Sequence, residues 1–453
     1  MKPKADVVVI GGSAAGVTAA ITSRRHRPDK SVLVIRAQRQ VPIPCGIPYI
    51  FGTVGSPDRN LIPDAVLEKN GIGFMIDEAV DVDRAARLVR TAGGESVGYE
   101  KLVLATGSEP IVPPIPGAGR ENVFTIEKAV PRLAELRSRV DAARDLVIVG
   151  GGFIGVEFAD ECRKGRPLNV AVVEMLPMCL AMAFDGGACS AVEGVLGERG
   201  VNVLAGVKVA SFEGDGETGP VRKAVLGDGR ELAADLVILA IGARANAALA
   251  AKIGLELGPN RAVQVDTHMR TSDPDIFACG DCAETLSFFT GKPTALKLAS
   301  IATMHARIAG ANLFGNRREN PGAIGVYSTV VGGRCFATAG LTEAAARELD
   351  YDVVVGQAGG PNRHPSGMPG AEELAVRLVC EKPSGRLLGG QVHGAASGGE
   401  LINAVSACIA ARLTADAVAL FQLGTHPALT ASPIAYQLVN AAEEAVKGLK
   451  TAS

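Results

Sequence analysis

The sequence contains no tryptophan, and aromatic residues make up only 4% of its 453 residues. This scarcity argues against a protein that binds single-stranded nucleic acid by stacking bases on aromatic rings. A basic surface for duplex nucleic acid is not indicated either. The chain has 46 Lys and Arg against 48 Asp and Glu, which gives a formal net charge of −2. We therefore expect no nucleic-acid partner.

Long apolar runs are also missing. No stretch of about 18 apolar residues indicates a membrane span, and the apolar run at residues 7–10 is too short for the core of a signal peptide. The nine cysteines, an odd number, follow no spacing typical of a secreted disulfide scaffold or of a metal site. The sequence therefore predicts a cytoplasmic protein with mostly free thiols, no metal and no membrane partner.

Apolar residues are abundant, at 47% against 21% charged, which is enough for packed cores in about three domains. Two segments, 7–35 and 146–174, repeat one design: an apolar strand, a glycine turn, a helix and a second apolar strand. Each has about 30 residues, the size of a mononucleotide-binding βαβ unit. Their short, continuously apolar strands predict parallel sheets that are covered on both faces.

Changes in composition predict where the chain crosses between domains. Residues 110–117 are too rich in proline for a helix or a central strand. Further changes come at 242–259 and at the polar stretch 316–322, after which the pattern becomes α+β. The elements expected there are strands near 326–330 and 374–380 and helices near 400–412 and 434–447.

The second βαβ unit contains a complete G-x-G-x-x-G turn, with glycines at Gly150, Gly152 and Gly155. Such glycines permit the tight turn and let the backbone approach a pyrophosphate, which the helix N-terminus then faces. Glu174 stands 19 residues beyond Gly155, at the end of the next strand. A carboxylate there can accept from an adenosine ribose 2′-hydroxyl and repels a 2′-phosphate, so the turn predicts NADH in preference to NADPH.

The first turn departs from this pattern, because Ser13 replaces the middle glycine. Its residues are Gly11, Gly12, Ser13, Ala14, Ala15 and Gly16. The position that would be acidic, 20 residues beyond Gly16, is Arg36. Arg36 either lies against an adenosine or faces solvent, and the sequence does not decide between the two.

Two further strands end in small turns, at residues 102–107 (Leu-Val-Leu-Ala-Thr-Gly) and 275–281, which closes with Gly280 and Asp281. A carboxylate at such a strand end can hold the ribityl hydroxyls of a flavin. In this order, the two glycine turns and the two strands resemble the pyridine nucleotide–disulfide oxidoreductase superfamily over nearly the whole chain. The resemblance implies FAD and NAD(H) as cofactors and a homodimer as the assembly.

The resemblance also implies an α/β fold class: two Rossmann-like three-layer domains, one for FAD and one for NAD, plus a C-terminal α+β dimerisation domain. In that family the FAD domain is split around the NAD domain. The expected boundaries are therefore 1–115 and 246–322 for the FAD-binding domain, 116–245 for the NAD(H)-binding domain, and 323–453 for the dimerisation domain.

Residues 41–49 read Val-Pro-Ile-Pro-Cys-Gly-Ile-Pro-Tyr. Dithiol members carry C-x4-C, but Gln40 and Ile50 stand at the two possible positions, so Cys45 has no such neighbour. The string resembles the single-cysteine branch, which contains coenzyme A-disulfide reductases, persulfide or polysulfide reductases, and NADH oxidases and peroxidases. It looks closest to the coenzyme A-disulfide reductases. We expect Cys45 to open a helix and to be redox-active, because a thiolate is both nucleophile and leaving group in disulfide exchange.

Cys279 and Cys282 form a C-x-x-C, but they bracket the expected flavin contact at Asp281, which argues against a dithiol role. The other six cysteines have no pairing logic, and we interpret them as packing residues. They are Cys162, Cys179, Cys189, Cys335, Cys380 and Cys408.

The resemblance leaves the acid–base residue open. In dithiol relatives a His-Pro near the C-terminus serves the partner's site and is oriented by a glutamate five residues later. Here His426 precedes Pro427, but Ala431 stands at the glutamate position. Tyr436 is an alternative, as a tyrosine serves in some coenzyme A-disulfide reductases. The histidine of peroxidases in the first glycine turn is replaced by Ala14.

Three further side chains have a role only by resemblance. Phe153 is either an aromatic gate over the flavin or a core residue, and Glu157 matches a glutamate near flavin and nicotinamide. Arg25 matches an arginine near the phosphates of coenzyme A, or it simply suits the end of its helix. The resemblance implies other cofactor contacts at Pro44, Val80, Ala105, Thr106, Gly107, Ala299, Ile154 and Gly242.

Together these features predict an FAD-dependent enzyme that passes electrons from NADH to a disulfide, persulfide or polysulfide at Cys45. Coenzyme A, as part of such a substrate, is a further expected ligand. The alternative is an NADH oxidase or peroxidase that reduces oxygen or peroxide through a Cys45 sulfenate.

Overall fold

The computed structural model describes residues 4–450 and groups the chain into two compact units. Of the described residues, the first unit contains 4–114, 121–143 and 238–323, and the second contains 115–120, 144–237 and 324–450. Within residues 4–450, no helix combines the length and the apolar character that crossing a membrane requires. The predicted four-part domain division stays a prediction.

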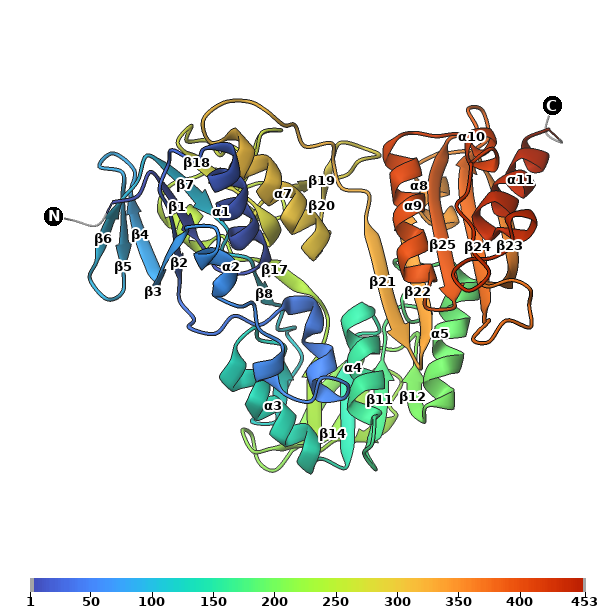
Figure 1. The fold of residues 1–453 in the computed structure, drawn as a ribbon. Coiled ribbons are helices and arrows are strands. Elements are labelled where there is room, and N and C mark those ends of the chain that lie inside the picture. Colours follow the sequence, from blue (N-terminus) through green and yellow to red (C-terminus); the bar gives the residue numbers. More distant parts are fainter. Residues whose placement is uncertain (1–3, 451–453) are drawn as a thin grey trace. The chain divides into compact units, whose positions relative to one another are not determined.

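A five-stranded parallel sheet forms the core of the first unit, with strand order β18-β7-β1-β2-β3. Its strands are β1 (Val7–Ile10), β2 (Val32–Arg36), β3 (Gly73–Ile76), β7 (Lys101–Leu104) and β18 (Ile276–Ala278). The strands of the first βαβ unit pair in register from Val7↔Val32 to Ile10↔Ile35. Helices α1 (Ala14–His26) and α7 (Ala299–Asn312) pack side by side, as Figure 1 shows. The predicted parallel sheet and its apolar strands are thereby confirmed.

Smaller elements complete the first unit. They are β4 (Ala79–Asp83), β5 (Leu88–Thr91), β6 (Ser96–Gly98), β8 (Ser108–Pro110), β9 (Val123–Thr125), β17 (Ala243–Ala245), β19 (Thr285–Leu286) and β20 (Pro293–Thr294), helices α2 (Ala65–Glu68), α3 (Val130–Ala142) and α6 (Ala248–Lys252), and the 3₁₀ helices η1 (Pro44–Gly46), η2 (Pro48–Phe51), η3 (Pro57–Arg59) and η4 (Gly280–Cys282). Strands β4, β5 and β6 form an antiparallel sheet of their own.

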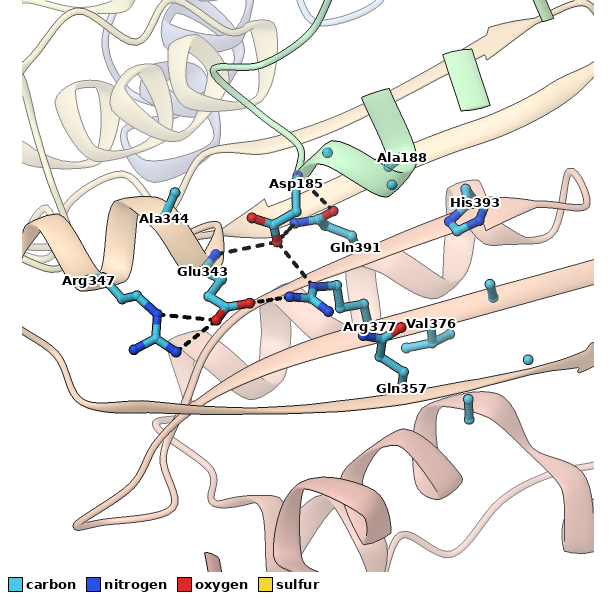
Figure 2. A pocket seen from close by; sticks show the side chains of 15 residues that line it. Asp185, Ala188, Glu343, Ala344, Arg347, Gln357, Val376, Arg377, Gln391 and His393 are labelled. Carbon is cyan, nitrogen blue, oxygen red and sulfur yellow. Dashed lines mark hydrogen bonds and ion pairs between the residues drawn. The ribbon is translucent and has the colours of Figure 1, made fainter. Parts of the chain in front are cut away.

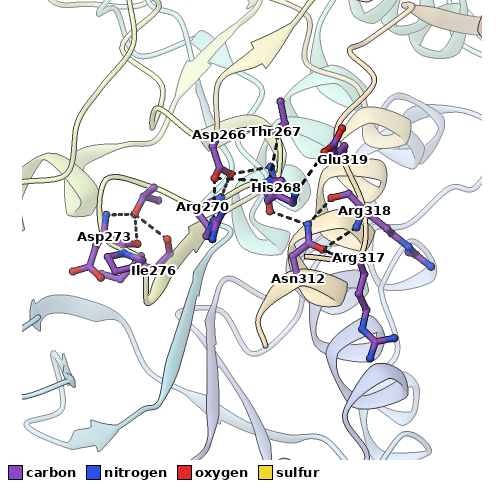
Figure 3. Close-up of polar contacts among 12 residues, drawn as sticks. Asp266, Thr267, His268, Arg270, Asp273, Ile276, Asn312, Arg317, Arg318 and Glu319 are labelled. Carbon is purple, nitrogen blue, oxygen red and sulfur yellow. Dashed lines mark hydrogen bonds and ion pairs between the residues drawn. The ribbon is translucent and has the colours of Figure 1, made fainter. Parts of the chain in front are cut away.

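One buried amide organises the polar stretch that follows α7 (Figure 3). The Asn312 side chain, 2% exposed, accepts hydrogen bonds from the backbone N–H groups of Arg317 (2.7 Å) and Arg318 (3.0 Å). Its amide nitrogen donates to the carbonyls of Arg318 (2.7 Å) and His268 (3.2 Å). Because both its donor and acceptor atoms are satisfied, Asn312 fixes this loop to the first unit despite its polar sequence.

The second unit contains the second βαβ unit, whose strands β10 (Asp145–Val149), β11 (Asn169–Val173) and β12 (Val201–Leu204) pair in parallel. Helix α4 (Phe153–Arg163) connects β10 to β11, and α5 (Gly186–Glu198) precedes β12. An antiparallel sheet of β13 (Val209–Gly214), β14 (Val221–Leu226) and β15 (Glu231–Ala233) follows. Strand β16 (Leu236–Leu239) lies where the chain passes back to the first unit.

The C-terminal part of the second unit is an antiparallel sheet in the order β21-β22-β25-β24-β23. Its elements are β21 (Val326–Val331), β22 (Arg334–Gly340), α8 (Glu343–Glu348), β23 (Val353–Pro361), β24 (Glu373–Glu381), β25 (Leu387–Gly394), α9 (Gly398–Ala410), α10 (Ala415–Ala419), η5 (Pro433–Ala435) and α11 (Gln437–Lys450). Helix α9 packs on β22 and β25, and α11 packs on β23 and β24. The predicted α+β pattern is confirmed, with element ends within a few residues of those expected.

Candidate active site

The first glycine turn is closed so tightly that no side chain fits at Gly11 or Gly16. A Cβ atom at Gly16 would lie 1.8 Å from the Gly11 carbonyl oxygen, and one at Gly11 would lie 2.1 Å from the Ala105 carbonyl oxygen. Gly11 takes φ +118°, which L side chains rarely adopt. Ser13 is the N-cap of α1 but makes no side-chain capping bond. The N–H groups of the first turn of α1 therefore point at a bare backbone cradle of the kind that binds phosphate.

Gly280 brings a third segment into the same cradle. A Cβ atom there would lie 2.7 Å from the Ala15 Cβ and 3.6 Å from the Ala302 Cβ, and Gly280 takes φ +78°. Ala15 belongs to the first turn of α1 and Ala302 to the first turn of α7, which begins at Ala299. The N-terminal ends of two helices thus converge on one glycine, which fits a bound dinucleotide.

Asp281 carries a polar cluster that the sequence motifs do not reveal. Its carboxylate accepts from the Ser108 hydroxyl (2.7 Å) and lies 3.5 Å from the Lys128 ammonium. Lys128 also donates to Ser108 (2.9 Å), while Lys297 donates to the Asp281 carbonyl (3.3 Å). Residues 108, 128 and 297 belong to no motif, and only the folded chain brings them to the strand end that carries Asp281.

The strand end at residues 105–107 is fixed by hydrogen bonds to Asn246. The Thr106 hydroxyl donates to the Asn246 carbonyl (2.5 Å), and the Asn246 N–H donates to the Gly107 carbonyl (2.9 Å). Gly107 takes φ +74° and has no atom within 4 Å of a Cβ built on it. The turn is thus rigid on one side and open on the other, as a ligand-facing turn requires.

Arg36 does not face solvent, which excludes one of the two alternatives that the sequence left open; its contact with an adenosine stays a prediction. Its side chain is 4% exposed, and its Cδ would lie 2.6 Å from a Cβ atom at Gly12. The guanidinium lies 4.8 Å from the Phe74 ring centroid and pairs with Asp64 at 2.7 Å. Its Nε is buried without a hydrogen-bond partner within the described residues. Arg36 therefore packs against Gly12 of the first glycine turn and has one donor, its Nε, without a hydrogen-bond partner within the described residues.

Cys45 lies in η1, the first of two short 3₁₀ helices, and not at the start of an α-helix as expected. The proline before it and Pro48 after it interrupt any longer helix, because neither can donate a backbone hydrogen bond. The Asn60 side chain donates to the Ile43 carbonyl (2.9 Å), and its Oδ1 lies where a Cβ at Gly46 would stand. The thiol is therefore presented on a loop that neighbouring chain segments hold.

Burial separates Cys45 from every other cysteine of the described chain. Cys45 is exposed, and the remaining eight are buried. Burial raises the pKa of the Cys179 and Cys380 thiols to about 12 and that of Cys335 to about 11. The pKa values of Cys279 and Cys282 are also raised by burial. The interpretation of six of these eight as packing residues agrees with their burial, and the burial of Cys279 and Cys282 agrees with the argument against a dithiol role.

The second glycine turn is braced by Glu174. Its carboxylate, 8% exposed, accepts from the backbone N–H groups of Gly151 (2.6 Å) and Leu176 (2.7 Å). Gly150 takes φ +107°, and Gly152, the N-cap of α4, has nothing within 4 Å of a Cβ built on it. The N-terminus of α4, with Ile154 and Gly155 in its first turn, is open above a turn that the carboxylate holds in place.

Two side chains of α4 contact β21 of the C-terminal sheet. The Phe153 ring is stacked on the Tyr327 ring, with centroids 4.8 Å apart and planes 1° apart, and the Phe184 ring lies 5.9 Å away on another side. The Glu157 carboxylate accepts from the Thr329 hydroxyl (2.7 Å). Burial raises the pKa of Glu157 to about 7, while the hydrogen bond from Thr329 opposes this shift. Neither Tyr327 nor Thr329 belongs to a sequence motif.

His426 lies in an exposed loop, where its Nδ1 accepts from the Ala428 N–H (3.2 Å). Tyr436 is half-buried just after η5, and burial raises the pKa of its hydroxyl. The same loop exposes large apolar side chains: Leu420 is 82% exposed, Leu429 71% and Ile434 88%. Large apolar side chains this exposed are more frequent on a surface that a partner covers than on a free one.

The other predicted contacts are distributed over the structure. Arg25 is exposed in the last turn of α1, about 17 Å along the helix axis from its first residue. The carbonyl of Val80 accepts from the Lys252 ammonium (2.8 Å), and Gly242 takes φ +100°. Pro44 is the first residue of η1. Across residues 4–450, no group of three or more His, Cys, Asp or Glu side chains is arranged to hold a metal ion.

A cavity of about 870 Å³ within the second unit lies beside α5, α8 and the C-terminal sheet. Figure 2 shows the hydrogen bonds and ion pairs among the residues that line it: Asp185 accepts from the Arg377 Nε (3.2 Å) and from the Gln391 amide (2.6 Å), and Arg377 also pairs with Glu343. Asp185 is the N-cap of α5 and follows Phe184. The network therefore ties the loop that carries Phe184 to the C-terminal sheet.

Family models match most of the chain. One described as pyridine nucleotide-disulphide oxidoreductase matches residues 5–306, and another, described as the dimerisation domain of that family, matches residues 326–434. The second model begins one residue before Tyr327, so β21 belongs to the part of the chain that it describes.

Relatives align along both units. An NADH oxidase of Methanocaldococcus jannaschii is 30% identical over 452 residues, which cover 98% of this chain and 99% of the relative. An NAD(P)H coenzyme A polysulfide/persulfide reductase of Pyrococcus horikoshii is 33% identical over 398 residues, 86% of this chain and 88% of the relative. A solved NAD-dependent persulfide reductase from A. fulgidus superposes with a TM-score of 0.89 at 32% identity, covering 98% of this chain and 84% of that one.

Proposed function

Because the chain belongs to the pyridine nucleotide-disulphide oxidoreductase family, we propose that it transfers electrons from NADH, by way of FAD, to a disulfide, persulfide or polysulfide at Cys45. The observation that carries this proposal is the burial contrast among the cysteines: one exposed thiol in a held loop, and eight that are buried. Relatives named for persulfide and polysulfide reduction support the choice of a sulfur substrate. A coenzyme A-linked disulfide or persulfide is the leading candidate.

The first unit would hold FAD. Residues 11–16 and the N-terminus of α1 would face its pyrophosphate, and Asp281, backed by Ser108 and Lys128, would accept from its ribityl hydroxyls. Arg36 would give its orphaned Nε donor to the adenosine side, in place of the more usual carboxylate. FAD, when bound, supplies a two-electron carrier between nicotinamide and sulfur. The close backbone approaches at Gly11 and Gly16, where a Cβ atom cannot be accommodated, support the assignment.

The second unit would hold NADH on the glycine turn at 150–155. Glu174 already accepts hydrogen bonds from two backbone N–H groups and would accept one more from a ribose hydroxyl, while its charge would repel a 2′-phosphate. Phe153 and Glu157 would stand near the nicotinamide. This arrangement favours NADH over NADPH.

The sulfur chemistry at Cys45 proceeds in two steps. The thiolate attacks a substrate disulfide RSSR, forms the mixed disulfide Cys45–S–S–R and releases one thiolate RS⁻. The two electrons of NADH then cleave the mixed disulfide, which regenerates the Cys45 thiolate and releases the second RS⁻. The balance is RSSR + NADH + H⁺ → 2 RSH + NAD⁺.

Steady-state assays of NADH consumption with coenzyme A disulfide, polysulfide, peroxide and oxygen test the proposal. Cys45→Ser should lose at least 1,000-fold in disulfide or polysulfide reduction, because serine neither attacks nor leaves at a useful rate (on the order of a nucleophile deletion). Cys408→Ala, at a buried cysteine of α9, is the control and should keep full activity. A Cys45→Ser enzyme with normal disulfide turnover would show that electrons reach the substrate without the thiol.

An NADH oxidase is the second candidate, since the M. jannaschii relative that aligns with 98% of this chain carries that name. Cys45 would then alternate between thiolate and sulfenate. The two activities separate in the same assays: an oxidase that works through the sulfenate consumes one O2 for every two NADH (O2 + 2 NADH + 2 H⁺ → 2 H2O + 2 NAD⁺), with Cys45 required and no disulfide present.

We also propose a homodimer, in which the loop from residue 420 to 436 meets a second copy and brings His426 or Tyr436 to its site. The exposed apolar side chains of this loop and the match to a dimerisation model support this arrangement. The four-part domain division is kept as a proposal, and so is a cytoplasmic location, which the buried thiols of Cys179, Cys335 and Cys380 favour.

A further inference from the structure

We propose that β21, a strand of the dimerisation part of the chain, positions the nicotinamide end of the site through two side chains. Thr329 holds the carboxyl of Glu157, and Tyr327 holds the ring of Phe153. The inference rests on the proposed function in one respect: it takes Phe153 and Glu157 to be the residues beside the nicotinamide. Both positioning residues and both contacts lie within the second unit.

Alternation along β21 places the two side chains on one face of the strand. Tyr327 and Thr329 are two residues apart and turned toward α4, which packs against β21. Ser328 and Val330, between and beyond them, are exposed. Phe153 and Glu157 are four residues apart on α4 and so share a face of that helix. Two neighbouring side chains on one face of β21 thus contact two side chains on successive turns of α4.

Thr329 is suited to hold a carboxyl because it is itself fixed. It is 3% exposed, in the interior of the β21–β22 ladder, where it pairs with Phe336. Its hydroxyl donates to the Glu157 Oε1 at 2.7 Å, a short bond that favours the ionised carboxyl. Removing the hydroxyl would leave the carboxyl buried with one donor fewer.

The charged surroundings of Glu157 are sparse. On its own helix, Glu161 raises the pKa of Glu157 further and is itself paired with Lys164 at 2.5 Å. On the packed strand, Tyr327 is the titratable neighbour, and burial raises the pKa of its hydroxyl to about 12, so it stays neutral. Thr329 is therefore the donor on which the protonation of Glu157 depends most directly.

Tyr327 acts on Phe153 by geometry. The two rings are parallel to within 1° at 4.8 Å, and Phe184 contacts the Phe153 ring from another side. This packing favours the rotamer in which the Phe153 ring lies against Tyr327 of β21. An aromatic pair of this kind changes an equilibrium by about 2- to 10-fold. Without Tyr327 the ring is released toward the position that the nicotinamide needs.

The first experiment measures the Glu157 carboxyl by itself. The infrared spectrum of the purified holoenzyme contains a carbonyl band for each protonated carboxyl. The band that disappears in Glu157→Gln belongs to Glu157, and the intensity of this band is measured as a function of pH. Thr329→Val should move the midpoint upward by about one pH unit, and Thr329→Ser should restore it. Thr338→Val is the matched control, since Thr338 is 2% exposed and donates instead to the Gly390 carbonyl (3.3 Å). An unshifted midpoint in Thr329→Val, or no such band in the wild type, overturns the role of Thr329.

The second experiment follows flavin reduction by NADH in a stopped-flow instrument. Tyr327→Leu should raise the NADH Kd by about 2- to 10-fold and change the limiting rate less, whereas Tyr327→Phe should leave both unchanged. An unchanged Kd in Tyr327→Leu overturns the role of Tyr327. A wild-type flavin that NADH does not reduce would instead refute the proposed function, and the infrared titration would still decide whether Thr329 holds Glu157.

Discussion

Replacing Glu174 by alanine should damage the NADH site far more than the NADPH site. The carboxylate is 8% exposed and accepts from two backbone amides, at 2.6 Å from Gly151 and 2.7 Å from Leu176. Hydrogen bonds to a charged group contribute about 1.5–3 kcal/mol each. A ribose hydroxyl bound by the same carboxylate adds one such bond for NADH alone. The loss of NADH affinity should then be about 10- to 100-fold.

Stability should fall in the same variant, because two buried N–H groups lose their acceptor. We expect the free energy of unfolding to drop by about 2–4 kcal/mol, less than the sum of two full bonds because water can reach the open turn at Gly152. The assay is kcat/KM for NADH and for NADPH, measured by flavin reduction. NADPH should be affected little or should improve, since the repulsion between the carboxylate and the 2′-phosphate is gone.

Asp235→Ala is the matched control. Asp235 also accepts from two backbone amides, those of Arg144 (3.0 Å) and Asp145 (3.2 Å), at the start of β10. This variant should lose stability without a change in the ratio of NADH to NADPH efficiency. If Glu174→Ala lowers kcat/KM equally for NADH and NADPH, Glu174 braces the turn and does not contact the ribose.

Three further predictions concern pH, packing and assembly. Burial raises the folded-state pKa of Glu157 from 4.5 to about 7. As the pH rises from about 4.5 to 7, the free energy of unfolding of the wild type should therefore fall, by up to about 3 kcal/mol. Glu157→Gln should therefore match the wild type in urea unfolding at pH 4.5 and exceed it at pH 8, and equal stability at both pH values would contradict the shift. Arg377→Met leaves Asp185 and Glu343 without their shared cation and should lower the free energy of unfolding in urea by about 1–2 kcal/mol. Arg347→Ala, at a more exposed arginine, should lower it by less than about 0.5 kcal/mol. Equal losses in the two variants would argue against a stabilising network at Arg377. Leu429→Asp with Ile434→Asp should give a monomer in sedimentation, and a dimer that survives both changes would move the interface elsewhere.

The sequence predicts the fold well where the signal is local. Continuous apolar runs such as residues 7–10 and 146–149 became buried parallel strands, and the glycines between strand and helix became the expected tight turns. The glycine pattern carries this information because a Cβ atom at Gly11 or Gly16 cannot be accommodated at all. The resemblance to the family, read from the same motifs, is confirmed by the models that match the chain.

Features that depend on tertiary contacts were beyond the sequence. Ser108 and Lys128 reach Asp281 from positions about 150–175 residues away in the chain, and Thr329 reaches Glu157 across 172 residues. No local pattern encodes such pairs. The helix expected at Cys45 is a 3₁₀ turn because two prolines flank it, and the burial of Arg36 depends on Phe74 and Asp64 from separate segments.

The most direct test of the central claim is the intact mass of the holoenzyme after incubation with a disulfide substrate, measured with and without NADH. If electrons pass through Cys45, the wild type should gain the mass of one thiol fragment, NADH should remove it, and Cys45→Ser should never acquire it. An increment of the same size on Cys45→Ser, or turnover of the disulfide by an enzyme that never carries the increment, would contradict electron transfer through Cys45.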